Sequence, residues 1–322
     1  MILTVTLNPL LERRMIFHSV TLGGEFRCRK EFFTAGGKGI NVSRQLNQFG
    51  MKNQAFTFLG GNNGKVLRHC LTDDQIEFSV VSSKSETRSA DLIIEEDNKR
   101  LTTLFGTNSY VTSEEASEFK NKLEKMIQNC SAVVLSGSSP CPETDDIFPY
   151  AIQLAHQHDK TSILDTYGLH LKNCIEAAPT IIHNNVTELE KSLNINLHSE
   201  ESKIDFLMQL YKKGIKLSFI TDGPGPAYAA KFDYIYKIES PQIEVVDATG
   251  SGDAFVAGIV YGMENSTVFE EMIKSSSALG VANATTQNTC AVSIELMEQY
   301  LDKITISTIG KKMKLIDDSP SY

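Results

Sequence analysis

Short apolar segments alternate with helical segments along most of this 322-residue chain. Runs such as Ala132–Leu135 and Thr180–Ile182 consist almost entirely of apolar residues, without the apolar–polar alternation of a half-exposed strand. Strands of this composition are buried on both faces, as in a parallel sheet covered by helices on both sides. The pattern therefore predicts an α/β fold with a mostly parallel central sheet.

The clearest helix is predicted to follow Thr112. Apolar residues including Phe119 and Leu123 recur there with the 3.6-residue period of a helix, and Thr112 with Glu115 matches a capping box. The other expected helices are Asn41–Phe49, about Thr187–Leu193, Ile204–Tyr211 and Ala254–Gly262, and further expected strands are Ile2–Leu7, Gln54–Leu59, Ser162–Leu164, Leu217–Ile220 and Ile243–Val246.

Two stretches interrupt this alternation. Met15–Phe33 lacks a helical apolar face, and Ser89–Glu95 with Leu101–Phe105 flank a polar run typical of a hairpin. We expect these stretches to pair as a small antiparallel β lid, formed by about residues 12–34 and 88–106 within a single domain over 1–322. Such a sheet would leave apolar side chains uncovered, and we expect these to be Phe17, Phe32, Phe33 and Leu92.

Charge and cysteine content limit the classes of partner. The chain has 40 acidic and 31 basic residues, a net charge of −9, and no basic cluster, so we expect neither nucleic acid nor a membrane as partner. No uncharged apolar run approaches the ~20 residues of a membrane span. The 6 cysteines are scattered without C-x-x-C spacing, which indicates reduced thiols in the cytoplasm. The tail from Lys311 is expected to be frayed.

The first motif with chemical potential is Gly36-Gly37-Lys38-Gly39, just before a predicted helix. Glycines allow backbone amides to approach an anion closely, and a helix N-terminus favours negative charge. The motif is not a Walker A loop, because Gly39 stands where Ser or Thr is required. A plain loop-to-helix turn would need only one glycine, so we favour anion binding.

The second motif is Asp247–Asp253, which opens the predicted helix Ala254–Gly262. Gly250, Ser251 and Gly252 form an amide nest suited to the charge on a transferring phosphoryl group. Asp253 beside this nest is placed to accept a proton from an attacking hydroxyl. Two alternatives are a simple helix cap at Asp253 and a dinucleotide fingerprint, but the third glycine of the fingerprint is replaced by Phe255.

These two motifs, together with Thr6-Leu7-Asn8-Pro9, resemble the signatures of the ribokinase-like (PfkB) carbohydrate kinases. The opening segment narrows the resemblance to the branch of 1-phosphofructokinases, tagatose-6-phosphate kinases and the minor 6-phosphofructokinase. The resemblance extends through nearly the whole chain. It implies a ribokinase-like three-layer sandwich, ATP and Mg²⁺ as cofactors, a monovalent cation as a further option, and a homodimer formed through the lid.

The resemblance also implies roles for individual residues. Asp253 would be the base, and Gly250, Ser251 and Gly252 would form the anion hole. The sugar phosphate would be bound by Glu12, Gly37, Lys38, Asn41, Arg88, Ser138 and Asp253; the nucleotide by Asn185, Thr221, Gly223, Ala248, Thr249, Gly250 and Gly252; and Mg²⁺ indirectly by Asn185 and Glu188.

Some positions depart from the pattern of the branch. Glu12 stands where the branch usually has Asp, and His183-Asn184-Asn185 replaces a usual Lys-Pro-Asn. Both positions concern the binding of substrate or nucleotide and leave the base and the anion hole intact. We expect ATP-dependent phosphorylation of a ketohexose monophosphate, with fructose 1-phosphate preferred. Tagatose 6-phosphate and fructose 6-phosphate remain alternatives, as does a sugar-phosphate sensor with little kinase activity.

Overall fold

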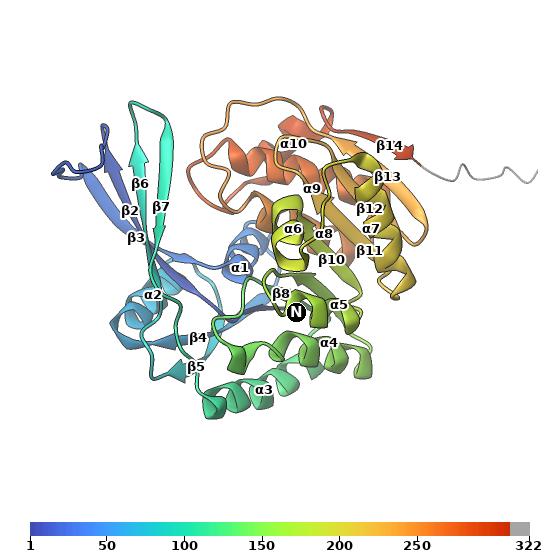
Figure 1. Cartoon of the computed structure of the whole chain (residues 1–322), viewed down its shortest axis with the longest axis horizontal. Coiled ribbons are helices and arrows are strands. Elements are labelled where there is room, and N and C mark those ends of the chain that lie inside the picture. The colour runs from blue at the N-terminus through green and yellow to red at the C-terminus, as the bar shows by residue number, and fades with distance from the viewer. Residues whose placement is uncertain (310–322) are drawn as a thin grey trace, which may run out of the picture.

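The computed structural model describes residues 1–309, so the tail from Lys311 lies outside the described part (Figure 1). Within it, a main sheet has the strand order β14-β13-β12-β11-β10-β9-β8-β1-β4-β5. Strands β11 to β5 in this order are parallel, and β12, β13 and β14 extend the sheet with antiparallel pairs. The strands are β1 Ile2–Thr6, β4 Asn53–Gly60, β5 Phe78–Ser83, β8 Ala132–Ser136, β9 Thr161–Asp165, β10 Ile181–Asn185, β11 Leu217–Thr221, β12 Ala227–Lys231, β13 Tyr234–Glu239 and β14 Thr305–Ile309.

Helices cover both faces of this sheet, as the mainly apolar strands predict. One core contains Phe119, which is fully buried and stacks on Phe56 at 3.9 Å and on Phe58 at 4.3 Å between ring centroids. On that face lie α3 Ser113–Gln128, α4 Ile147–Gln157, α5 Leu171–Glu176, α6 Val186–Leu193 and α7 Glu200–Lys212. On the other lie α1 Lys38–Gln48, α8 Ser251–Glu264, α9 Phe269–Ala284 and α10 Ile294–Leu301.

The predicted capping box at Thr112 is confirmed. The Thr112 side chain accepts the Glu115 amide at 3.3 Å, and the Glu115 carboxylate accepts the Thr112 amide at 3.0 Å. A second box of the same kind joins Asn185 and Glu188 at the start of α6. Among residues 1–309, no helix has the length and apolar character that crossing a membrane requires.

A small sheet stands beside the main body as a separate blade (Figure 1). Its order is β3-β2-β6-β7, with β2 Leu10–Phe17, β3 Lys30–Gly36, β6 Ser89–Glu95 and β7 Arg100–Phe105. The outer pairs are antiparallel, and the central β2–β6 pair is parallel. Helix α2, Gly61–Asp73, packs between this sheet and β4, the strand next to the edge strand β5 of the main sheet.

Three expectations about local structure are wrong. Leu92 is buried against Leu10 and Ala90 of the small sheet itself, and Phe17 is also buried, whereas Phe32 and Phe33 are exposed as expected. Helix α1 begins at Lys38 and helix α8 at Ser251, each three residues before its predicted start. Residues 243–246 form a loop instead of a strand. The amide of Val246 donates to the carbonyl of Ala284 in α9, so this segment pairs with a helix end.

Candidate active site

A cavity of about 1000 Å³ opens at the carboxyl ends of the parallel strands, where α/β sheets bind their ligands. Asp165, Asn185 and Thr221 are the last residues of β9, β10 and β11. The cavity also reaches the N-termini of α1 and α8, which the two sequence motifs form. The predicted site residues that line it are Gly37, Lys38, Asn41, Arg88, Ser138, Asn185, Glu188, Thr221, Gly223, Ala248, Thr249, Gly250, Ser251, Gly252 and Asp253.

Glu12 is the predicted site residue that does not line the cavity. Its side chain is buried, and its Oε2 accepts hydrogen bonds from Arg14 Nε at 3.3 Å and from Thr34 Oγ1 at 3.2 Å. The longer side chain at this position is thus directed to a basic neighbour two residues along the same strand. Binding of a sugar hydroxyl by Glu12 stays a prediction.

The amides before and within the first turn of α8 face the cavity without partners. Gly250 caps this helix with φ 79°, a conformation that glycine adopts without strain. The amide of Ser251 donates to Ala248 O at 3.2 Å, but within residues 1–309 the amides of Gly250, Gly252 and Asp253 have no acceptor. Together with the positive end of the helix dipole, these amides make an anion-binding site.

Asn283 on α9 braces the loop that carries these amides. Its Nδ2 donates to Thr249 O at 2.9 Å and to Ser251 Oγ at 3.1 Å, while its Oδ1 accepts the Cys290 amide at 2.7 Å. The side chain is buried, so the contacts are shielded from water. Sequence reasoning missed Asn283, because a lone polar residue late in an apolar helix carries no motif.

Asp253 is the third residue of α8, and its carboxylate is not used as a helix cap. Its Oδ2 accepts a hydrogen bond from Asn41 Nδ2 at 2.7 Å, and its Oδ1 has no partner in the described part of the chain. Burial raises the pKa of Asp253 to about 7; the charge of Asp165 adds to this rise, while Lys38 opposes it. Such a carboxyl exchanges protons near neutral pH, as a general base requires.

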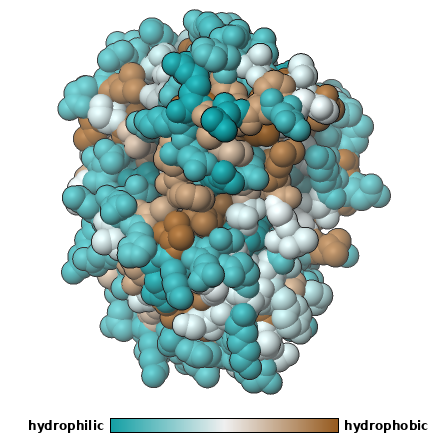
Figure 2. Space-filling view, turned by 90° about the vertical axis from the view of Figure 1, so that its left-hand side faces the viewer, coloured by the Kyte–Doolittle hydropathy of each residue, from teal (hydrophilic) through white to brown (hydrophobic). Residues whose placement is uncertain are grey.

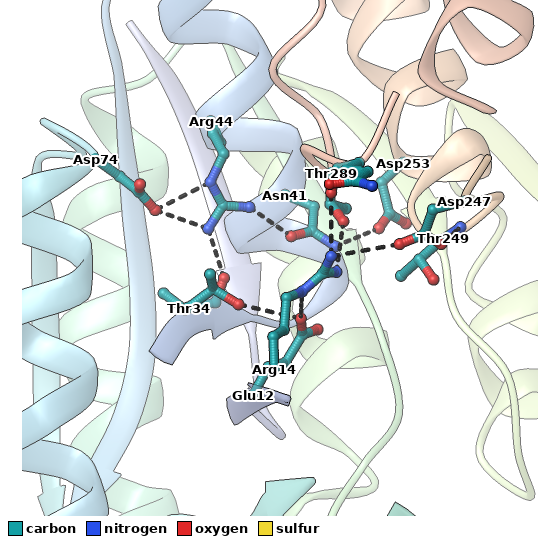
Figure 3. A network of polar contacts seen from close by, with 12 residues as sticks. Glu12, Arg14, Thr34, Asn41, Arg44, Asp74, Asp247, Thr249, Asp253 and Thr289 are labelled. Carbon is teal, nitrogen blue, oxygen red and sulfur yellow. Dashed lines mark hydrogen bonds and ion pairs between the residues drawn. The ribbon is translucent and has the colours of Figure 1, made fainter. Parts of the chain in front are cut away.

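The amide of Asn41 is oriented from its other side by Arg44 (Figure 3). Arg44 Nη1 donates to Asn41 Oδ1 at 2.8 Å, and the guanidinium is itself held by Asp74 Oδ2 and by the carbonyl of Ala35. Because its oxygen accepts from Arg44, Asn41 presents its NH₂ group to Asp253. Arg44 lies three residues after Asn41 on the same helix face, a spacing that sequence analysis could have used.

Lys38 is the cation of this buried cluster. Its Nζ donates to Glu188 Oε1 at 2.6 Å and to Asp165 Oδ1 at 3.1 Å. Burial lowers the pKa of Lys38, but the charges of Asp165, Glu188 and Asp253 outweigh burial and raise it above its usual value. Lys38 therefore stays charged, and its charge is shared mainly between two carboxylates that do not include Asp253.

Asp165 is a site residue that sequence reasoning did not select. Burial alone would raise its pKa, but Lys38 and His183 reverse the effect and lower the pKa of Asp165 to about 2. His183 lies 3.2 Å from Asp165 Oδ1 through Nδ1 and 3.2 Å from Thr221 Oγ1 through Nε2. The position of Asp165 at the carboxyl end of an apolar parallel strand is the sequence feature that would have identified this aspartate as a site residue.

Asn185 and Glu188 form a helix cap in addition to lining the cavity. The Glu188 amide donates to Asn185 Oδ1 at 2.8 Å, and Glu188 Oε2 accepts the Asn185 amide at 3.2 Å. No group of three or more His, Cys, Asp or Glu side chains among residues 1–309 could hold a metal by itself. Asn185 and Glu188 line the cavity, and each of their side-chain oxygens has a second lone pair free for water bound to a metal that a ligand brings in.

Arg88 lies at the end of the cavity next to the small sheet. Its Nη2 donates to Asn8 O at 3.0 Å and its Nε to Pro9 O at 3.3 Å, while the Asn8 side chain donates to Ser138 Oγ at 3.0 Å. Burial lowers the pKa of Arg88, although a guanidinium stays charged throughout the physiological range. Within residues 1–309 its hydrogen bonds go to neutral carbonyls, so no carboxylate in contact neutralises it.

Known proteins resemble this chain over nearly its full length. Residues 19–296 match the model of the pfkB family of carbohydrate kinases. A tagatose-6-phosphate kinase of Staphylococcus epidermidis is 30% identical over 309 residues, covering 95% of this chain and 99% of that protein.

Solved structures show the same architecture. A possible 1-phosphofructokinase of Thermotoga maritima has a TM-score of 0.86 at 25% identity, covering 96% of this chain and 99% of the other. Escherichia coli phosphofructokinase-2, in a complex with potassium, has a TM-score of 0.85 at 22% identity, covering 94% and 98%, and shows the shared fold. The family match and the curated relative together establish that this chain belongs to the pfkB family of carbohydrate kinases.

Proposed function

We propose that this carbohydrate kinase phosphorylates a ketohexose monophosphate with ATP, and that fructose 1-phosphate, giving fructose 1,6-bisphosphate, is its most favoured substrate. The observation that carries the proposal is Asp253, a buried carboxylate with a pKa of about 7 beside the unpaired amides of α8. Transfer of a phosphoryl group to a hydroxyl needs a base next to a site that stabilises negative charge, and the start of α8 has both.

In the proposed reaction, Asp253 takes the proton of the attacking hydroxyl through the oxygen that Asn41 leaves free. The amides of Gly250, Gly252 and Asp253 stabilise negative charge on the group being transferred. When bound, ATP supplies that group, and Mg²⁺ neutralises charge on its phosphates. Asn185 and Glu188 line the cavity and offer the oxygens that would hold the metal through water. The proton stays on Asp253 until product leaves.

Arg88 supports a substrate that already carries a phosphate. The guanidinium of Arg88 donates its hydrogen bonds within the protein to neutral carbonyls, so its positive charge remains available for an anion. Arginine binds phosphate oxygens well. Lys38 is less available, because two carboxylates already hold it. A phosphate at Arg88 would direct the far end of the sugar toward Asp253.

The opposite end of the cavity suits a nucleotide. Thr221 and Gly223 lie at the end of β11, and apolar side chains of the loop after β13 and of α9 provide a surface for a flat base. These apolar residues are Pro241, Ile243, Val245, Val281 and Ala284. We propose that adenine binds there, with its phosphates directed to the first turn of α8.

The identity of the ketohexose rests on the relatives. A tagatose-6-phosphate kinase and a possible 1-phosphofructokinase resemble the chain over nearly its whole length, so tagatose 6-phosphate and fructose 6-phosphate stay as alternatives to fructose 1-phosphate.

A sensor with little turnover would not need a base of raised pKa, and Asp253 therefore favours an enzyme. Six free cysteines are in accord with a reducing cytoplasm.

We also propose that the small sheet is a lid through which two copies of the chain form a homodimer. On the side of the molecule where this sheet lies, apolar side chains are exposed among polar ones (Figure 2). Residues paired across neighbouring strands point to the same face of a sheet. Phe33 pairs with Arg13, Arg13 with Asp91, and Asp91 with Leu104, so Phe33 and Leu104 lie on one face, and both are exposed. A two-fold pairing would cover this face and exclude water from the sugar site.

The role of Asp253 is tested by Asp253→Asn. We expect the variant to fold, to bind ATP and phosphosugar in calorimetry, and to lose about 10²- to 10⁴-fold in kcat, because the hydroxyl no longer loses its proton to a base. ADP release in a coupled assay measures the loss. Asp302→Asn, at a fully exposed carboxylate, should keep the wild-type rate. A kcat of Asp253→Asn within a few-fold of wild type would remove Asp253 from the mechanism.

The raised pKa of Asp253 predicts the pH dependence of kcat/KM. The carboxylate is the active form, so activity should fall about tenfold per pH unit below about 7 and level off above it. Lys38 lowers this pKa, so Lys38→Met should move the midpoint to higher pH. Initial rates between pH 5.5 and 8.5 measure both midpoints. A wild-type profile that is flat down to pH 5.5 would contradict the assignment.

The lid proposal predicts a dimer in sedimentation at micromolar concentration. Phe33→Asp should give monomers. It should also raise the rate at which ATP is hydrolysed by water without transfer of phosphate to the sugar, because water then reaches the site. Phe232→Asp is the matched control, because Phe33 and Phe232 are both 45% exposed and Phe232 lies outside the small sheet. A wild-type monomer with full kinase activity and no such hydrolysis would contradict the lid proposal and leave the kinase assignment in place.

A further inference from the structure

Arg14 connects the small sheet to the loop before α8 (Figure 3). It lies on strand β2, yet only 4% of its side chain is exposed. Its Nη1 donates to Asp247 Oδ2 at 3.3 Å and to the carbonyl of Gln287 at 3.1 Å. Its Nη2 donates to Thr289 Oγ1 at 2.9 Å, and its Nε donates to Glu12 Oε2 at 3.3 Å. One guanidinium thus holds four separate groups.

The groups that Arg14 holds lie directly behind the anion-binding amides. Asp247 Oδ1 accepts the amide of Thr249 at 2.8 Å and so begins the turn that ends at Gly250. On the other side, Thr289 packs so closely on Gly250 that a Cβ there would lie 2.4 Å from Thr289 Cγ2. Arg14 therefore fixes both neighbours of the loop that presents the amides, without lining the cavity itself.

The oxygens around the Arg14 guanidinium are of the kind that an alkali-metal cation binds. Carboxylate, backbone carbonyl and hydroxyl oxygens surround the guanidinium, and protein sites for potassium and sodium are built from such oxygens. A second cation at the same oxygens would lie within a few ångströms of the guanidinium, where like charges repel strongly. A dissociable monovalent cation therefore does not fit at these oxygens of this chain.

We propose that Arg14 is a built-in cation of the anion site: its guanidinium takes the place of a bound monovalent cation behind the α8 loop and makes the kinase independent of potassium. Arg14 acts through Asp247 and Thr289 and is a positioning residue. The inference rests on the kinase function of the family and not on the identity of the sugar.

Removal of the guanidinium has a definite electrostatic consequence. Glu12 and Asp247 would remain as two buried carboxylates without their shared cation, next to the place where negative charge accumulates during transfer. The loop would lose its link to β2, and the freed oxygens would form a site that a small cation can enter. Potassium should therefore bind to and assist Arg14→Ala while leaving the wild type unchanged.

Thermal unfolding tests the cation site without any substrate. The melting temperature of the wild type should be the same in potassium chloride and in tetramethylammonium chloride at equal ionic strength. Arg14→Ala should melt lower in tetramethylammonium and gain about 2–4 °C in potassium, as binding to the folded state alone predicts. Lys213→Ala is the control, because Lys213 makes an exposed ion pair with Glu176 and lies outside the small sheet. A wild type stabilised by potassium would overturn the proposal.

Steady-state kinetics tests the positioning role. Without potassium, Arg14→Ala should lose about 10- to 100-fold in kcat, the range for residues that support a site from behind, and potassium or free guanidinium should restore most of it. Arg14→Lys should retain more activity than Arg14→Met, because it keeps the charge. If the wild-type rate rises several-fold with potassium, or if Arg14→Met matches the wild type, the proposal is wrong. Should Arg14→Ala not fold, the comparison of Lys with Met at this position decides.

Discussion

The site depends on how three carboxylates, those of Asp165, Glu188 and Asp253, share one partly buried cation, Lys38. Lys38 donates hydrogen bonds to Asp165 and Glu188, and Asp253 is left with the neutral amide of Asn41 as its direct partner. Burial would raise the pKa of both carboxyls; Lys38 and His183 in contact with Asp165 lower its pKa instead, whereas Asp253 has no cation in contact and its pKa stays raised. Environments that separate the pKa values of neighbouring carboxyls assign the acid–base roles. The same unequal sharing keeps Lys38 charged and leaves Asp253 as the carboxyl suited to the proton-accepting role proposed above.

The fold brings these groups together through helix starts and strand ends. Helix α1 supplies Lys38 and Asn41 from one face of its first turns, and α8 supplies Asp253 with its free amides; the two helices pack against each other. Strands β9 and β10 end at Asp165 and Asn185, on the same edge of the sheet. Two helix N-termini and one cluster of carboxylates thus meet at the cavity, as the proposed phosphoryl transfer requires.

Much of this arrangement follows from the sequence, because local patterns determine it. Apolar strands predict the covered parallel sheet, and glycines around Lys38 and before Asp253 predict the two helix starts to within three residues. Arg14 could not be found in this way: on a strand of mixed character it resembles a surface residue, and its partners other than Glu12 lie more than 230 positions away. Leu92 was misjudged for a related reason, since neighbours within the small sheet cover it. Contacts of this kind depend on the completed fold.

The most direct test of the central claim is to follow the γ-phosphoryl group of labelled ATP into products over a panel of sugars and sugar monophosphates. The panel contains fructose 1-phosphate, tagatose 6-phosphate, fructose 6-phosphate and the free sugars, and mass spectrometry identifies each product. Transfer by Asp253 to a substrate held at Arg88 predicts label in a bisphosphate and little label in products of free sugars. Efficient labelling of a free sugar, or label only in inorganic phosphate, would contradict it.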